Sequence, residues 1–377
     1  MSYRERAGSP GPKKLLALDG GGIRGVLSLE VLAQIERTLR AELRHGEDRG
    51  EDFVLADYFD YIAGTSTGAI IAAGLSLGWP VERLRRLYAL NGEEMFDKAL
   101  LLRRYRYKYD SSRLAAMLQR EFGAATTLGG DQLQTLLMMV LRNATTDSPW
   151  PLSNNPRAKF NTPQRSDNNL DLPLWQLVRA STAAPVYFPP EIVTVGDQEF
   201  VFVDGGLTMY NNPAFQLFLM ATLDAYGLGW ETGEGKLLLV SVGTGAAPHA
   251  NAYLAPGDMN LLYNASSVPG ALMYAAATEQ DLLCRIFGRC RHGAAVDREI
   301  GDLRHDRGLM DRRLFSYVRY NADLSRAGLD ELGLPDVDPQ SAQRMDSVEH
   351  IGDLQRIGMS LARDVEAAHF EGFLDHQ

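Results

Sequence analysis

The chain has 377 residues, of which 45% are hydrophobic and 23% are charged, a composition that is ordinary for a globular protein with a sizeable core. Its formal net charge of −10 argues against nucleic-acid polymers as partners. The N-terminus lacks the apolar core of a signal peptide, and no apolar run approaches the ~20 residues that span a bilayer, so we expect a cytoplasmic protein.

The first part of the chain alternates between predicted strands and helices. Residues 1–14 are rich in Gly, Pro and charge and predict a flexible tail. The apolar run 14–19 predicts a buried strand, and apolar spacings of three and four over 29–43 predict a helix of about five turns. Residues 58–64 predict a second strand, followed by a helix rich in small residues. This alternation indicates an α/β fold with a central, mostly parallel sheet.

The remainder of the chain is less regular. Residues 143–172 are dominated by Asn, Pro, Ser, Thr and Asp and predict a long irregular excursion. Residues 198–206 and 236–245 each predict a strand that ends in a tight turn. Beyond them, Ala-, Met- and Leu-rich segments predict a largely helical C-terminal extension over 246–377. We therefore expect a catalytic domain at 15–245, with this extension packed on it or continuous with it.

The glycine-rich loop DGGGIRG spans residues 19–25, between a predicted strand and a helix. Its glycines match the G-x-G-x-x-G pattern of dinucleotide-binding proteins. A dinucleotide site also needs an acidic residue closing a second strand about 20 positions later, and the charged segment found there follows no predicted strand. Three consecutive glycines also leave backbone N–H groups free to point at an anion. That anion is either a phosphate or an oxyanion that forms during a reaction.

The segment GTSTG, residues 64–68, fits the G-x-S-x-G nucleophile elbow and lies between a predicted strand and a predicted helix. Gly64 and Gly68 would relieve crowding around a strained turn that exposes the Ser66 hydroxyl. The alternative is an ordinary turn between strand and helix. A donor loop upstream favours the nucleophile, because acyl transfer needs both a nucleophile and an oxyanion hole.

A serine nucleophile also needs a base, and the sequence offers two candidates. Asp204 ends an apolar strand, where burial would raise its proton affinity and suit it to accept the serine proton. His249 is the one histidine that closely follows a predicted strand, and it would complete a conventional triad. A plain Asp-Gly turn at Asp204 remains the structural alternative.

Taken together, DGGGIRG, GTSTG and DGG occur in the order typical of the patatin-like phospholipases, and the chain resembles that family over about residues 15–245. The segments VRASTAAPVYFPP (178–190) and SVGTG (241–245) also resemble it. The resemblance implies a three-layer patatin-like fold and a Ser66–Asp204 dyad. Many members have alanine where this chain has Gly206, a difference that we expect to cost nothing.

The resemblance also implies how the loop of DGGGIRG is used. It assigns an oxyanion hole to the backbone of Gly20, Gly21 and Gly22, with Arg24 anchoring the loop. The remaining motif positions are glycines that allow close approach of backbone and substrate: Gly25, Gly64, Gly68, Gly205 and Gly206. The implied reaction is hydrolysis of fatty-acyl esters of membrane phospholipids through an acyl-enzyme, with no metal or organic cofactor. The competing hypothesis is a non-enzymatic nucleotide-binding sensor in which Ser66 is incidental.

Two further segments concern membranes and regulation. Residues 99–110 interleave Arg and Lys with Tyr, which suits an anionic membrane surface, a phosphate-bearing ligand or an ordinary exposed strand. Residues 266–288 and 315–324 resemble, more loosely, the tails of bacterial patatin-like effectors of the CapV type. That resemblance implies a cyclic dinucleotide activator made during phage infection, homo-oligomerisation on activation, and a peripheral position at the inner membrane when active. The alternative is a constitutive esterase without nucleotide control.

Overall fold

A computed structural model describes residues 2–374, except 44–51, 97–110, 186–187, 248–260, 308 and 310. The basic and aromatic segment 99–110 and His249 therefore lie outside the described residues. The helices and strands are α1 (Tyr3–Gly8), β1 (Lys13–Leu18), η1 (Gly22–Arg24), α2 (Gly25–Glu42), α3 (Leu55–Tyr58), β2 (Tyr61–Thr65), α4 (Thr67–Ser76), α5 (Val81–Phe96), α7 (Ser111–Phe122), β3 (Leu136–Asn143), β4 (Ser148–Ser153), η2 (Asn169–Asp171), α8 (Leu174–Ser181), β5 (Glu191–Val195), β6 (Gln198–Asp204), η3 (Gly205–Leu207), α9 (Ala214–Thr222), η4 (Asp224–Tyr226), β7 (Leu237–Val242), α10 (Leu261–Phe287), β8 (Arg289–His292), β9 (Ser316–Tyr320), α11 (Arg326–Glu331), α12 (Pro339–Gln343), η6 (Val348–His350), α13 (Ile351–Leu361), η7 (Ala362–Asp364) and η8 (Ala367–Phe370).

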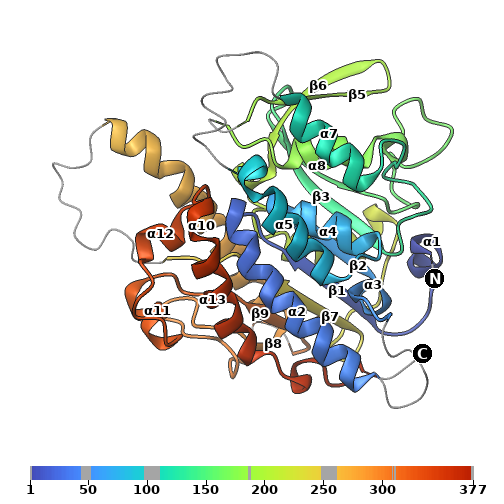
Figure 1. Ribbon diagram of the computed structural model, residues 1–377. Helices are drawn as coiled ribbons and strands as arrows, with labels where there is room; N and C mark the ends of the chain where they lie inside the picture. The colour runs from blue at the N-terminus through green and yellow to red at the C-terminus, as the bar shows by residue number, and fades with distance from the viewer. Residues whose placement is uncertain are drawn as a thin grey trace.

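Within the described residues, nine strands form one sheet in the order β5-β6-β3-β2-β1-β7-β9-β8, with β4 paired to β3 (Figure 1). Strands β3, β2, β1, β7, β9 and β8 lie side by side in that order, and each neighbouring pair among them is parallel. Strands β4 and β6 pair antiparallel with β3, and β5 pairs antiparallel with β6. The predicted α/β fold with a mostly parallel central sheet is confirmed.

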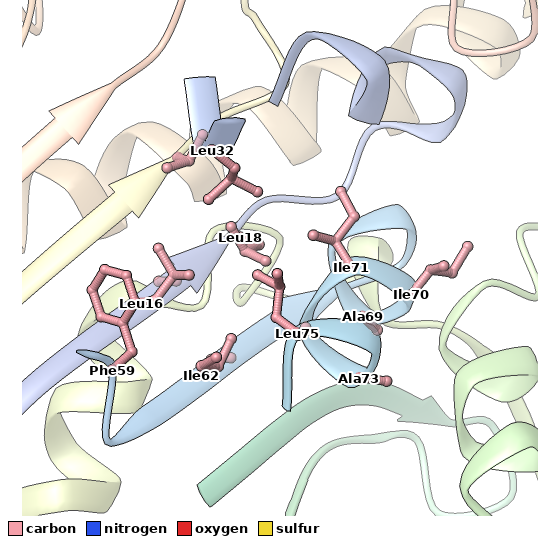
Figure 2. Packing of buried hydrophobic residues seen from close by; sticks show 14 of the residues in the cluster. Leu16, Leu18, Leu32, Phe59, Ile62, Ala69, Ile70, Ile71, Ala73 and Leu75 are labelled. Atoms are coloured by element: carbon pink, nitrogen blue, oxygen red, sulfur yellow. The ribbon is translucent and has the colours of Figure 1, made fainter. Parts of the chain in front are cut away.

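Helices cover the sheet because its central strands are apolar on both faces. All residues of β2 and β7 are buried, as expected for strands with helical layers on each side. Helices α2, α5 and α13 pack together in front of the sheet in Figure 1, while α9 contacts β1 and β7 and packs against α10. Figure 2 shows how the small residues of α4, Ala69 and Ala73 among them, bring this helix close to β2.

The N-terminal segment differs from the flexible tail predicted for residues 1–14. It forms the short helix α1, and β1 already begins at Lys13. Tyr3 is fully buried, and its hydroxyl donates to the carbonyl of Gly129 at 3.1 Å. The buried Arg6 donates to the carbonyl oxygens of Ala56 at 2.6 Å and Gln134 at 2.9 Å. Charge and glycine suggested solvation, but these side chains satisfy backbone carbonyls at the edge of the core.

Two other regions are more regular than predicted. The excursion 143–172 contains β4, an edge strand that tolerates its two prolines because one side of it needs no ladder hydrogen bonds. The C-terminal region is largely helical, but β8 and β9 extend the central sheet through the β7–β9 pairing. These two strands are short and contain charged residues, so they lack the apolar pattern that predicts a buried strand. Strands β8 and β9 therefore belong to the same sheet as β1 and β7.

Candidate active site

Strand β3 brings the ends of β2 and β6 together. Residues 138–140 of β3 pair with β2 on one side and with β4 on the other, and residues 141–143 pair with β4 and β6. Strand β6 must therefore lie on the same side of β3 as β2 and continue where β2 stops. Thr65 is opposite Val140, and Asp204 is opposite the next residue, Leu141. This register places Ser66 beside Asp204.

Ser66 occupies a strained turn between β2 and α4. Its φ of 53° and ψ of −122° are unusual for a residue with a side chain and match the geometry expected of a nucleophile elbow. The Ser66 N–H donates to Ser181 Oγ at 3.0 Å, and Ser181 Oγ donates to the Val140 carbonyl at 2.7 Å. A Cβ atom on Gly68 would lie 2.3 Å from the carbonyl oxygen of Leu18, so this turn can approach β1 only with glycine there.

The Ser66 hydroxyl donates to Asp204 Oδ2 at 2.6 Å, and both side chains are buried. The other carboxylate oxygen, Oδ1, accepts the N–H of Gly206 at 2.7 Å. Burial raises the pKa of Asp204 to about 6, although the hydrogen bonds from Ser66 and Gly206 oppose the shift. At neutral pH the carboxylate is ionised and has a proton affinity suited to general base catalysis.

The glycine loop follows β1 and lies beside the turn at Ser66. The Gly20 N–H donates to the backbone carbonyl of Asn211 at 3.0 Å. This bond occupies the only hydrogen on that amide, so the Gly20 N–H is not free to donate to an oxyanion in this structure. The N–H groups of Gly21 and Gly22 form no hydrogen bond within the described residues, and they are the donors left in the loop.

Contacts from the C-terminal region hold this loop. Gly22 has φ of +61°, and a Cβ atom there would lie 2.3 Å from the carbonyl oxygen of Met345, which accepts the N–H of Ile23 at 3.0 Å. Arg24 Nε forms a long hydrogen bond of 3.4 Å to the carbonyl of Gly21 within this loop. Burial lowers the pKa of Arg24 to about 10, and Asp19 opposes this shift.

A buried ion pair fixes the start of the loop. Arg319 of β9 donates to both carboxylate oxygens of Asp19, at 2.8 and 2.6 Å, and also to Ser241 Oγ at 2.7 Å. Both charged groups are buried. Such bidentate pairs are strong and directional, and losing one partner would leave an uncompensated buried charge.

The structure brings Ser66, Asp204 and the glycine loop to one place. Sequence reasoning assigned no role to Ser181, Asn211 or Arg319, although all three touch these elements. Ser181 lies within VRASTAAPVYFPP, a segment by which the chain resembles the patatin-like phospholipases, so the sequence did single out its neighbourhood. Arg319 comes from a distant strand, and no local pattern marks it as a partner of Asp19.

Comparison with known proteins identifies the family of the chain. The family model of the patatin-like phospholipases matches residues 16–218, which is more than half of the chain. The chain belongs to the patatin-like phospholipase family. A similar protein is an intracellular phospholipase A2 of Caenorhabditis elegans, 32% identical over 249 residues, or 64% of this chain and 20% of that protein.

The chain is also similar to two further relatives. A cGAMP-activated phospholipase of Escherichia coli is 33% identical over 245 residues, covering 61% of this chain and 62% of that protein. Patatin-17 of Solanum cardiophyllum is 30% identical over 250 residues, which cover 61% of this chain and 60% of that protein. The matched part of this patatin-like phospholipase family member thus spans less than two thirds of each of these relatives.

Proposed function

We propose that the protein is a lipid acyl hydrolase that cleaves fatty-acyl esters of membrane phospholipids with a Ser66–Asp204 dyad. The observation that carries the proposal is the 2.6 Å hydrogen bond from Ser66 Oγ to the buried Asp204 carboxylate. Membership of the patatin-like phospholipases supports a lipid ester as the substrate class. A nucleotide-binding sensor with an incidental Ser66 would not need a strained serine paired with a buried base.

In the proposed acylation step, Ser66 Oγ attacks the ester carbonyl while Asp204 Oδ2 takes its proton. The developing oxyanion accepts hydrogen bonds from the free N–H groups of Gly21 and Gly22. Helix α4 begins at Thr67, so the positive end of its dipole also lies at the nucleophile. Asp204 then returns the proton to the leaving lysolipid, and a fatty-acyl ester of Ser66 remains.

Exposed apolar side chains near Asp204 support contact with a lipid surface. Val268 and Leu272 lie four residues apart on α10 and so share one side of the helix, where Leu272 is 65% exposed. Leu207 and Met209, just after Asp204, are also exposed. The first half of α10 projects from the body of the molecule in Figure 1. We name these four residues the apolar rim.

Helix α10 is fixed beside the catalytic carboxylate. The Met273 side chain lies 3.2 Å from where a Cβ of Gly206 would be, and Asn212 Nδ2 donates to the carbonyl of Ala277 at 3.4 Å. Insertion of the apolar rim into a bilayer would therefore bring the surface to Ser66. Among the described helices, none combines the length and hydropathy needed to cross a bilayer.

We predict that the double variant Val268→Glu/Leu272→Glu loses at least about tenfold of its activity on phospholipid vesicles, because two apolar anchors of roughly 1.5–3 kcal/mol each are lost. Hydrolysis of a soluble short-chain ester should stay within about twofold. Met359→Glu on α13 removes an exposed apolar side chain elsewhere and serves as the matched control. Vesicle activity equal to wild type, or an equal loss on the soluble ester, would contradict the apolar rim.

We also propose that a cyclic dinucleotide activates the hydrolase, that activation involves homo-oligomerisation and a peripheral position at the inner membrane, and that the setting is bacterial anti-phage defence. The support is the similarity to cGAMP-activated phospholipases of Escherichia coli and Vibrio cholerae. The Arg-rich segment 285–291 is a weak site for such a ligand, because Arg285 is buried and its donors bind Asp281 and the carbonyl of Asp302.

The experiment that tests this function measures fatty-acid release from vesicles of mixed phospholipids, with and without each member of a panel of cyclic dinucleotides. We expect release by the wild type to rise at least about tenfold with one nucleotide. Equal release in its presence and absence would leave a constitutive lipase and remove the activator. If no release occurs under any condition, reaction of Ser66 with a fluorophosphonate probe separates a missing activator from incorrect chemistry.

A further inference from the structure

An unpaired amide oxygen lies beside the proposed dyad. Asn211 is buried, and its Oδ1 has no hydrogen-bond partner within the described residues. A buried acceptor without a partner costs about 1–3 kcal/mol, so its retention at this position calls for a functional explanation. The backbone of the same residue is engaged, since its carbonyl accepts the Gly20 N–H.

Two glycines locate this oxygen relative to the reacting groups. A Cβ atom on Gly206 would lie 3.0 Å from Asn211 Oδ1 and 3.0 Å from Asp204 Oδ1, so the two oxygens are at most about 6 Å apart. A Cβ atom on Gly20 would lie 2.4 Å from Asn211 Oδ1 and 3.3 Å from Ser66 Cβ, which also limits the distance from Asn211 Oδ1 to Ser66 Cβ to about 6 Å. A water molecule that donates at about 2.8 Å to each of two acceptors, with its O–H bonds about 105° apart, joins acceptors about 4.5 Å apart, a distance within this limit.

From this geometry we infer that the Asn211 carboxamide orients the water that hydrolyses the acyl-enzyme, an inference that rests on the proposed function. The water donates one hydrogen to the Asp204 carboxylate and the other to Asn211 Oδ1. With both hydrogens bonded, a lone pair of the water faces the acyl carbon on Ser66. Acylation needs no water, so this role is confined to the second half of the reaction.

The hydrolysis step needs only the water, Asp204 and the acyl ester of Ser66. The water oxygen forms a bond to the acyl carbon, and the bond from that carbon to Ser66 Oγ breaks. One water proton passes to Asp204 and then to Ser66 Oγ, while the oxygen that came from water leaves with the fatty acid. Asn211 exchanges no proton and serves to position the nucleophile.

The test compares acylation and deacylation in Asn211→Ala, which removes the amide but keeps the backbone bond to Gly20. With p-nitrophenyl butyrate as substrate, we expect steady-state turnover to fall about 10- to 100-fold, the cost of one well-placed hydrogen bond. Intact-mass spectrometry should show a larger fraction of enzyme acylated on Ser66 at steady state. The rate of fluorophosphonate labelling should stay within about threefold, because the probe reports only attack by Ser66.

The neighbouring Asn212 provides a matched control. Asn212 is also buried, but its amide is satisfied by the Ala214 N–H at 3.1 Å and the Ala277 carbonyl at 3.4 Å. Asn212→Ala should lower stability and leave the acylated fraction at the wild-type level. Asn211→Ser is the second variant if Asn211→Ala does not fold.

Two results would overturn the inference. If labelling and turnover fall by the same factor in the Asn211 variants, the residue supports the structure and does not orient water. Unchanged turnover and acylated fraction would show that the amide has no part in deacylation. If the wild type itself shows no Ser66-dependent turnover or labelling, the proposed function is wrong, and the inference, which rests on it, is wrong as well.

Discussion

Replacing Ser66 with alanine should lower ester hydrolysis by about 10⁴-fold or more, because the nucleophile is removed and only substrate binding and the oxyanion donors remain. The variant should also lose all covalent labelling by a fluorophosphonate. Both readouts use the purified chain: fatty-acid or p-nitrophenol release measures turnover, and mass spectrometry locates the probe. The backbone at residue 66 is strained with serine and with alanine alike, so we expect the variant to fold.

Ser360→Ala is the matched control for this prediction. Its hydroxyl donates to the carbonyl of Leu332 at 2.7 Å, a comparable hydrogen bond on α13 with no link to the dyad. This variant should keep its activity within about twofold. Substantial hydrolysis by Ser66→Ala would mean that another residue is the nucleophile and would reject the proposed chemistry.

Asp204→Asn should lose most of its activity while being more stable than the wild type at pH 8. The amide is nearly isosteric, but it cannot accept the proton of Ser66, so we expect a loss of at least about 10³-fold in kcat/KM. In the wild type, an acid limb with an apparent pKa of about 6 should appear in the pH profile of kcat/KM. Exposed Asp336, paired with Arg356 on the surface, gives the control variant Asp336→Asn, for which activity should not change.

The stability difference follows from the sign of the Asp204 shift. Its pKa is 3.8 in the reference state and about 6 when folded, so the native state binds the proton more tightly than the unfolded chain. Folding stability should therefore fall as pH rises from about 4 to 6, by up to about 3 kcal/mol, and stay lower above that window. Asp204→Asn has no carboxyl group to ionise at this position, so its folding stability should not show this fall. Denaturant unfolding of both proteins at pH 4 and pH 8 measures it, and a difference that does not change with pH would contradict the raised pKa.

Local sequence patterns were sufficient for the elements that carry the site. The apolar run before DGGGIRG became β1, and the small residues after GTSTG became α4, because burial on both faces and close helix packing leave a direct trace in composition. Patterns were insufficient for α1, β4, β8 and β9. In α1 the charged Arg6 is satisfied by carbonyls far away in the chain, those of Ala56 and Gln134, and in β4 two prolines are tolerated because the strand lies at a sheet edge.

The sequence by itself determined the family, the candidate nucleophile Ser66 and the candidate base Asp204, because each lies in a short motif whose residue types follow from its chemistry. Only the tertiary structure decided how they meet: strand β6 continues along β3 where β2 ends, and this register sets the 2.6 Å contact. It also showed that the Gly20 N–H is engaged by the Asn211 carbonyl, and it joined Asp19 to Arg319. These pairings connect residues up to 300 positions apart, and no local spacing encodes a contact that depends on the pairing of distant strands.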